Sequence, residues 1–231
     1  MHQSPLPVCG EQRVTRRSTQ QGEAPSGAAR SAGGIVGLVL AAGESSRMGT
    51  LKALLPWDGV PLIQYQVECL RYAGAGLVIV LLGHRAEEIR PHVPVGPDVR
   101  VVVNDRYRSG KTTSVKAGLA QVPSDVEGLV LVTVDQPRPM PLVAALVQTF
   151  REHRAPVTQP TFGGRRGHPM VFRADVLSPL ADIREETQGI KPVVDSYRAQ
   201  ALLVPVDSPI VLVDLNTEAD YEHARALWSD L

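Results

Sequence analysis

Continuous apolar runs constrain the fold of this chain more than any other sequence feature. They cover residues 35–42, 77–82, 99–103 and 128–134. A strand that is apolar throughout is typical of a strand buried on both faces. Helical patterns lie between the runs, and strands that alternate with helices form right-handed βαβ crossovers. The sequence therefore predicts an α/β domain with a mainly parallel sheet and ligand-binding residues at the carboxyl ends of its strands.

The other periodic segments complete this prediction. Helices are expected at 61–73, at 140–153 and from 218 to 228, with a further helix beginning within 109–114. One more apolar strand is expected from Ile210 to the acidic residue Asp214. Residues 157–172 hold two apolar segments around three glycines, which predicts an antiparallel hairpin.

The balance of charge excludes some classes of partner. Lys and Arg number 24, and Asp and Glu also number 24, so no global field draws the protein to nucleic acid or to a membrane surface. No run approaches the ~20 apolar residues of a membrane span. The two cysteines, Cys9 and Cys69, lack companions at metal-ligand spacing, which favours a reducing compartment. We therefore predict a cytoplasmic protein without nucleic-acid or membrane partners.

The amino-terminal segment differs from the rest of the chain. Residues 1–33 are rich in Ser, Gln, Pro, Gly and Arg and show almost no apolar periodicity. Such a segment cannot bury enough apolar surface to offset the entropy of ordering, and it lacks the apolar part of a secretion signal. We predict a disordered leader at 1–33 and one folded domain at 34–231.

The first apolar run ends in a loop of small and basic residues. This loop contains Gly43, Ser45, Ser46, Arg47, Gly49 and Lys52. Small residues let backbone N–H groups approach an anion, while Arg47 and Lys52 supply charge that neutralises phosphate. The loop is a candidate triphosphate cradle, with an ordinary strand-to-helix turn as the alternative. It is not a Walker loop, because Lys52 stands three residues after Gly49 and no Ser or Thr follows it.

The most hydrophobic run delivers Asp135-Gln136-Pro137 at its carboxyl end. A carboxylate held at the end of a rigid strand suits a hard cation such as magnesium. The alternative is that Asp135 caps the helix near Pro141. The triphosphate cradle favours the metal, because a triphosphate site needs a divalent ion.

The segment Leu40-Ala-Ala-Gly43, followed by Arg47-Met-Gly and then Lys52, resembles the opening signature of nucleotidyltransferases with a glycosyltransferase-A-like fold. From about Ile35 onward the chain resembles the MobA-like molybdenum cofactor nucleotidyltransferases, especially the cytidylyltransferase branch. This resemblance implies a three-layer α/β/α, Rossmann-like domain at 34–231, with a small antiparallel hairpin insertion in a mainly parallel sheet.

The resemblance also implies roles for individual residues. The implied nucleotide contacts are Leu40, Ala41, Ala42, Gly43, Arg47, Lys52, Gly83, His84, Asn104, Ser114 and Asp135, of which Arg47, Lys52 and Asp135 would be catalytic. The implied acceptor contacts are Gly167, His168 and Pro169, where His168 contacts an acceptor phosphate or only orients the turn. Asp135 and Asp214 would bind magnesium. The chain has Glu218 and Ala219 where the family has proline and glutamate, which weakens the assignment of Asp214. The alternative for part of this motif is a helix cap at Thr217, with Asp220 at the third helical position.

The implied reaction is transfer of CMP from CTP to the phosphate of molybdopterin, with release of pyrophosphate. The product would pass to a molybdenum hydroxylase. The alternatives are a guanylyltransferase or another nucleotidyltransferase with a different phosphorylated acceptor, a glycosyltransferase, and a non-catalytic chaperone of the molybdenum cofactor. A glycosyltransferase usually carries an Asp-x-Asp metal motif, where this chain has Asp135-Gln136-Pro137.

Overall fold

The computed structural model describes residues 34–44 and 48–229. Its main sheet has the strand order β10-β7-β9-β6-β1-β4-β5, and β8 pairs with β7 outside this path. The strands are β1 (Ile35–Ala41), β4 (Ala75–Leu82), β5 (Val99–Val103), β6 (Gly128–Thr133), β7 (Val157–Phe162), β8 (Arg165–Arg166), β9 (Met170–Arg173) and β10 (Leu202–Pro205). A separate antiparallel pair joins β2 (Pro56–Trp57) and β3 (Val60–Pro61).

Most pairs in the main sheet are parallel. Strand β1 lies between β4 and β6 and is parallel to both, β4 is parallel to β5, and β10 is parallel to β7. Strand β9 runs antiparallel between β6 and β7, and β8 is antiparallel to β7. The hairpin predicted at 157–172 is therefore present, and its strands extend the main sheet.

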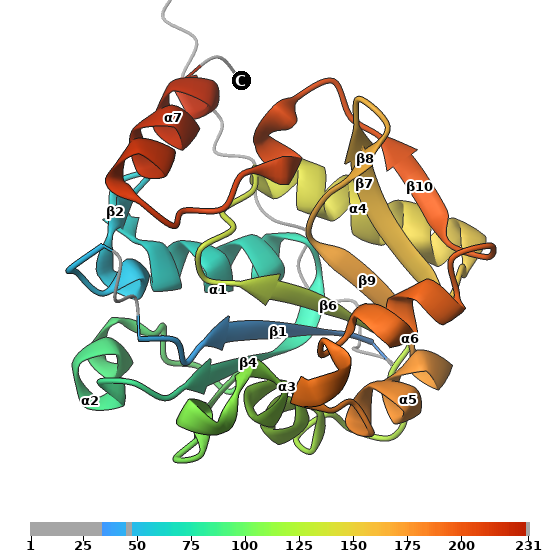
Figure 1. Cartoon of the computed structure of the whole chain (residues 1–231), viewed down its shortest axis with the longest axis horizontal. Helices are drawn as coiled ribbons and strands as arrows, with labels where there is room; N and C mark the ends of the chain where they lie inside the picture. Colours follow the sequence, from blue (N-terminus) through green and yellow to red (C-terminus); the bar gives the residue numbers. More distant parts are fainter. Residues whose placement is uncertain (1–33, 45–47, 230–231) are drawn as a thin grey trace, which may run out of the picture.

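Helices cover both faces of the sheet. They are α1 (Leu62–Tyr72), α2 (Ala86–Ile89), α3 (Lys111–Leu119), α4 (Met140–His153), α5 (Leu177–Ala181), α6 (Lys191–Ser196) and α7 (Glu218–Ser229). Helices α1, α4 and α7 lie on one side of the sheet, and α3, α5 and α6 lie on the other (Figure 1). This arrangement confirms the three-layer α/β/α fold.

The two faces of β1 explain why its sequence is apolar throughout. Ile35 and Val39 belong to the hydrophobic cluster shared with α1 and α4, whereas Val36 and Leu38 belong to the cluster shared with α3 and α5. All four side chains are at most 3% exposed. Burial of one such side chain contributes roughly 1.5–3 kcal/mol, so the two clusters hold the edge that carries the loops in a fixed position.

One predicted strand is wrong. Residues from Ile210 onward form the 3-10 helix η6 (Pro209–Leu212) instead of a strand. Pro209 fits the first turn of a helix, and the Ser208 hydroxyl accepts a hydrogen bond from the Ile210 N–H at 3.3 Å. The Val211 carbonyl accepts from the His168 N–H at 2.9 Å, so the backbone here pairs with a loop rather than with a strand. The nearby strand β10 (Leu202–Pro205) was not predicted.

Helix α7 begins with reciprocal hydrogen bonds between Thr217 and Asp220. The Asp220 N–H donates to Thr217 Oγ1 at 3.2 Å, and the Thr217 N–H donates to Asp220 Oδ2 at 2.8 Å. This capping box satisfies two N–H groups that the helix leaves without intrahelical partners. It confirms the cap predicted at Thr217 and fixes where the chain turns after Asp214 and Asn216.

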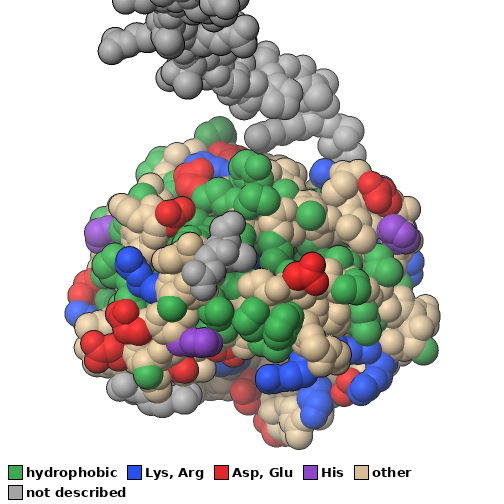
Figure 2. Space-filling view, turned by 90° about the horizontal axis from the view of Figure 1, so that it is seen from above, with side chains coloured by type: hydrophobic (Ala, Val, Ile, Leu, Met, Phe, Trp, Pro, Cys, Tyr) green, Lys and Arg blue, Asp and Glu red, His purple; other side chains and the backbone are tan. Residues whose placement is uncertain are grey.

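The surface carries charge of both signs. On the face seen in Figure 2, acidic and basic side chains are interspersed, in keeping with the balanced composition. Among the described residues, no helix has the length and hydrophobicity that a bilayer crossing requires. The leader predicted at 1–33 lies outside the described residues.

Candidate active site

Lys52 links three distant segments of the chain. It is the last residue of the candidate triphosphate cradle and begins the 3-10 helix η1 (Lys52–Leu54). Its ammonium donates to Asp135 Oδ2 at 3.1 Å and to Asn216 Oδ1 at 2.9 Å. The Lys52 side chain is 12% exposed, so its charge is held in place and only partly screened by water. The ammonium is thus preorganised beside two oxygen ligands.

Asp135 follows β6 and is held on both carboxylate oxygens. Thr133 Oγ1 donates to Asp135 Oδ1 at 2.6 Å, while Lys52 binds Oδ2. Burial raises the pKa of Asp135, but the Thr133 hydrogen bond and the Lys52 charge outweigh burial and leave the pKa below its ordinary value. The carboxylate is therefore ionised at neutral pH. Its hydrogen bonds do not cap helix α4, whose N-cap is Pro139.

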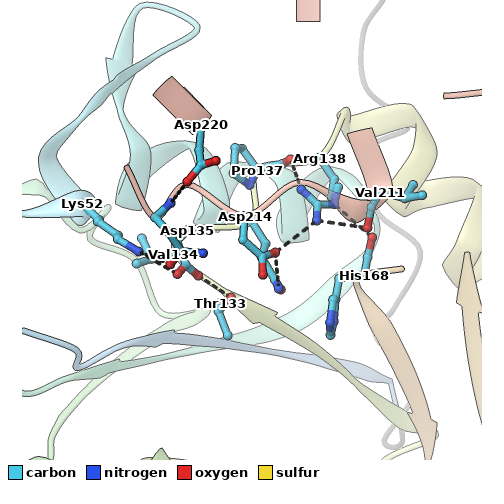
Figure 3. Close-up of polar contacts among 12 residues, drawn as sticks. Lys52, Thr133, Val134, Asp135, Pro137, Arg138, His168, Val211, Asp214 and Asp220 are labelled. Atoms are coloured by element: carbon cyan, nitrogen blue, oxygen red, sulfur yellow. Dashed lines mark hydrogen bonds and ion pairs between the residues drawn. The ribbon is translucent and has the colours of Figure 1, made fainter. Parts of the chain in front are cut away.

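Asp214 lies next to Asp135 because the residue that follows it is hydrogen-bonded to the Asp135 backbone. The Leu215 N–H donates to the Asp135 carbonyl at 2.8 Å. Figure 3 shows the Asp135 and Asp214 side chains in the same cluster of polar contacts. Gln136 Nε2 donates to Asp214 Oδ1 at 2.8 Å, and the Arg138 guanidinium is 4.0 Å from the same oxygen. Asp214 is exposed, so one side of this carboxylate faces solvent.

A pocket opens at the carboxyl ends of β1 and β6, beside the start of α3. Its lining comprises Leu40, Ala42, Gly43, Glu44, Lys52, Tyr107, Lys111, Ser114, Thr133, Val134, Asp135 and Asn216. Six predicted nucleotide contacts line it, namely Leu40, Ala42, Gly43, Lys52, Ser114 and Asp135. The pocket therefore combines small apolar residues, two lysines and two carboxylates, and its lysines suit the anionic tail of a nucleotide.

Other predicted contacts lie outside this lining. Ala41 is 3% exposed and packs in the core, because alternate residues of β1 point to opposite faces. Asn104 is buried and donates to Thr113 Oγ1 and Ser114 Oγ, each at 2.9 Å, so it orients the start of α3. The prediction for Arg47 falls outside the described residues.

Gly83 and His84 do not line the pocket, but they contact residues that do. The His84 N–H donates to the Ala42 carbonyl at 3.2 Å, and His84 Nδ1 is 3.3 Å from the hydroxyl of Tyr107, which lines the pocket. A Cβ at Gly83 would lie 2.8 Å from the Cβ atoms of both Ala42 and Tyr107 and 2.9 Å from the Ala42 carbonyl oxygen. Only glycine fits this approach of two backbones.

Replacing Gly83 with alanine is expected to destabilise the fold by roughly 1–3 kcal/mol, because neither contacting Cβ atom can rotate away. Urea unfolding would measure the change. Gly43→Ala is the matched control, since a Cβ at Gly43 meets nothing within 4 Å. Equal stability of the two variants would contradict the packing argument.

The predicted acceptor triplet packs against η6. A Cβ at Gly167 would lie 2.5 Å from the Val211 carbonyl oxygen, and the His168 N–H donates to that oxygen. Burial and the nearby Arg138 guanidinium lower the pKa of His168, so its ring is neutral at neutral pH. The structure thus anchors the backbone of the triplet, and neither Gly167, His168 nor Pro169 lines the pocket.

Several site residues were missed by sequence reasoning. These are Glu44, Tyr107, Lys111, Thr133, Val134 and Asn216 in the pocket, with Gln136 and Arg138 beside it. Lys111 had a signal, because it follows a glycine at a predicted helix start. Asn216 had one in its place two residues after Asp214. Nothing in the sequence pattern distinguished Arg138 or Tyr107 from surface residues.

The oxygen ligands around Lys52 fit a small divalent cation. Among the described residues, no group of three or more His, Cys, Asp or Glu side chains could hold a metal ion by itself. Asp135 and Asp214 supply two neighbouring carboxylates, and Asn216 supplies an amide oxygen. Magnesium is commonly bound by one or two carboxylates together with substrate phosphates and water. The residues present therefore fit a magnesium ion that binds with a triphosphate.

Comparison with known proteins gives relatives along most of the chain. A molybdenum cofactor cytidylyltransferase of Escherichia coli is 25% identical over 84% of this chain and 97% of its own length. A nicotine blue oxidoreductase of Paenarthrobacter nicotinovorans is 32% identical over 64% of this chain and 74% of its own.

Other matches are shorter. The bifunctional protein GlmU of Geobacter sulfurreducens is 32% identical over 36% of this chain, which spans only 18% of that protein. A molybdenum cofactor guanylyltransferase of Xanthomonas euvesicatoria is 46% identical over 29% of this chain and 39% of its own length.

Solved structures show the same fold. Rv0371c of Mycobacterium tuberculosis superposes with a TM-score of 0.71 and 29% identity over 85% of this chain and 99% of its own. Its complex with manganese superposes with a TM-score of 0.68 and 28% identity over 84% and 98%. The family described as the MobA-like NTP transferase domain matches residues 37–202, which is most of the chain and includes the cradle loop and Asp135. The chain therefore belongs to the MobA-like NTP transferase family.

Proposed function

We propose that this chain transfers CMP from CTP to the phosphate of molybdopterin and releases pyrophosphate in a magnesium-dependent reaction. The observation that carries this proposal is the Lys52 ammonium, held between Asp135 and Asn216 in the pocket that Gly43 also lines. A fixed cation beside a carboxylate is what a triphosphate with its metal requires.

The chain would act by positioning its two substrates. An oxygen of the acceptor phosphate attacks the α-phosphorus of CTP, and the bond from that phosphorus to the bridging oxygen of the β-phosphate breaks as pyrophosphate leaves. The acceptor phosphate is already ionised near neutral pH, so the reaction needs no general base. Lys52 and Arg47 would bind the triphosphate, and Lys52 would meet the charge that develops on pyrophosphate.

The carboxylates have a separate role in this proposal. Asp135 and Asp214 would hold magnesium, which when bound neutralises phosphate charge. The complex of Rv0371c with manganese supports a divalent ion in this fold. Asn216 and Thr133 would keep Lys52 and Asp135 in place before the substrate arrives.

The choice of CTP and molybdopterin rests on the relatives. The Escherichia coli cytidylyltransferase aligns with 84% of this chain, whereas the Xanthomonas guanylyltransferase aligns with 29%. The triplet Gly167-His168-Pro169 would contact the acceptor. On this proposal residues 34–231 form the catalytic domain of a cytoplasmic enzyme whose product is passed to a molybdenum hydroxylase.

Calorimetric titration with CTP, GTP, ATP and UTP, with and without magnesium, tests the nucleotide. We expect CTP to bind at least about tenfold more tightly than the others, and only with magnesium, because the phosphate charge must be neutralised. A pyrophosphate-release assay with molybdopterin then tests the acceptor. Preference for GTP would assign the chain to guanylyl transfer.

The nicotine blue oxidoreductase relative makes a control reaction necessary, because one fold supports different chemistries. Oxidation or reduction of nicotine blue by the protein, without pyrophosphate release from CTP, would overturn the proposal. Failure to bind any triphosphate would instead favour a non-catalytic chaperone of the molybdenum cofactor.

A further inference from the structure

We propose that Arg138 is a positioning residue, which holds the turn Gly167–Pro169 in a fixed place relative to Asp135 and Asp214. The identity of the acceptor at this turn rests on the function proposed above. The coupling itself is a statement about the structure and can be tested without turnover.

The guanidinium of Arg138 joins three segments of backbone. Its Nε donates to the His168 carbonyl at 3.0 Å, its Nη1 to the Pro137 carbonyl at 2.8 Å, and its Nη2 to the Val211 carbonyl at 3.2 Å. Figure 3 shows these contacts converging on the one side chain. A planar guanidinium can bind three acceptors in different directions at once, which a lysine ammonium cannot do in the same geometry.

The other side of Arg138 is anchored to helix α1. Its backbone carbonyl accepts a hydrogen bond from the Tyr65 hydroxyl at 2.8 Å, and Cys69 Sγ lies 3.7 Å from the same oxygen. Tyr65 and Cys69 are each 2% exposed and belong to the main hydrophobic cluster. Arg138 is therefore a rigid link between the core and the turn.

Burial makes this link costly to build, which argues against an incidental surface contact. Arg138 is 1% exposed, and burial lowers its pKa to about 10, so it remains charged at neutral pH. A buried charge is a poor source of stability compared with an apolar side chain of similar volume. We therefore assign the buried guanidinium a positioning role. It lies 4.0 Å from Asp214 Oδ1.

The Val211 carbonyl couples the turn to Asp214. It accepts from both Arg138 Nη2 and the His168 N–H, so the turn and η6 meet at one oxygen. Gly167 packs against the same oxygen, with room for no Cβ. Three residues later the chain reaches Asp214. Loss of Arg138 would therefore move the turn relative to Asp214, whose carboxylate keeps the hydrogen bond from Gln136 Nε2.

Arg138→Lys tests the link, with Arg90→Lys, an exposed arginine on η2 (Arg90–His92), as the control. We expect the KM for molybdopterin to rise at least about tenfold, while kcat changes less than about threefold and the Kd for CTP stays within about twofold. If Arg138 had a purely structural role, its replacement would weaken the binding of CTP and of molybdopterin together. That result, or an unchanged KM for molybdopterin, would overturn the proposal.

Hydrogen exchange decides the coupling independently of activity. In Arg138→Lys the amides of 166–168 and 210–214 should exchange at least about tenfold faster, while those of α3 do not change. Unchanged exchange would overturn the link even if the enzyme is active. Absence of CMP transfer by the wild-type protein would instead reject the proposed function, and accelerated exchange would still support the link.

A second variant covers a failure of Arg138→Lys to fold. Gly167→Ala places a Cβ against the Val211 carbonyl and leaves the arginine intact. It should produce the same pattern, with faster exchange in both segments and a raised KM for molybdopterin. Protection equal to wild type in both segments would overturn the proposal.

Discussion

Lys52→Ala is expected to lower kcat/KM for nucleotidyl transfer at least about 100-fold, which corresponds to ~2.7 kcal/mol of transition-state stabilisation. The ammonium is held by Asp135 and Asn216 before substrate binds, so no reorganisation is needed when charge develops on the leaving pyrophosphate. Alanine removes this charge, and water that enters the space screens the pocket. Initial rates of pyrophosphate release would measure the loss.

The fold should survive this change. Asp135 keeps the Thr133 hydrogen bond, and Lys52 contributes no side chain to the hydrophobic clusters. Lys191→Ala is a matched control, because Lys191 is exposed at the start of α6 and lies outside the pocket lining. Near-ultraviolet circular dichroism would show that both variants are folded. Turnover by Lys52→Ala within about threefold of wild type, with CTP saturating, would remove Lys52 from the catalytic residues.

Asp135→Asn should produce a loss of similar size for a different reason. We expect kcat to fall at least about 100-fold and the magnesium concentration for half-maximal rate to rise at least about tenfold. Asparagine has nearly the shape of aspartate, and its oxygen can still accept from Thr133 Oγ1, but it carries no charge for a cation. The pKa of Asp135 lies below its ordinary value, so the wild-type carboxylate is charged throughout the neutral range.

Magnesium titrations at saturating CTP would measure this effect. Asp182→Asn is the control, because Asp182 is exposed and lies outside the pocket lining. An unchanged magnesium requirement in Asp135→Asn would transfer the metal-binding role to Asp214 and Asn216. An unchanged kcat as well would show that Asp135 serves only to hold Lys52.

Local pattern was sufficient for most of the fold. The apolar runs at 35–42 and 128–134 predicted β1 and β6, because a strand buried on both faces has no polar side to interrupt it. Helix α4 was predicted at its observed bounds from periodicity, and the cap of α7 from Thr217 and Asp220. In each case the deciding interactions lie within one or two turns, or within one strand.

The strand predicted from Ile210 onward was wrong, because residues 209–212 form a 3-10 helix. Four apolar residues in succession suit either a buried strand or a buried helical turn, and periodicity does not separate the two over so short a run. Whether a strand or a helical turn forms depends on the hydrogen-bond partners that lie nearby in space. Strand β10 occupies the sheet edge beside β7, and the Val211 carbonyl meets His168 and Arg138. No property of residues 209–212 themselves contains that information.

By itself, the sequence determined most of the strands and helices in their order, the position of Lys52 after a small, basic segment, and an aspartate at the end of the central strand. These depend on hydrophobic period and on residue type, which are local. Only the tertiary structure decided that Asn216 shares the Lys52 ammonium and that Arg138 joins the turn at His168 to Val211. Their partners stand 164, 30 and 73 residues apart in the chain. Contacts over such separations form only when the packed sheet brings strand ends together, because hydrogen-bond partners are chosen by distance in space.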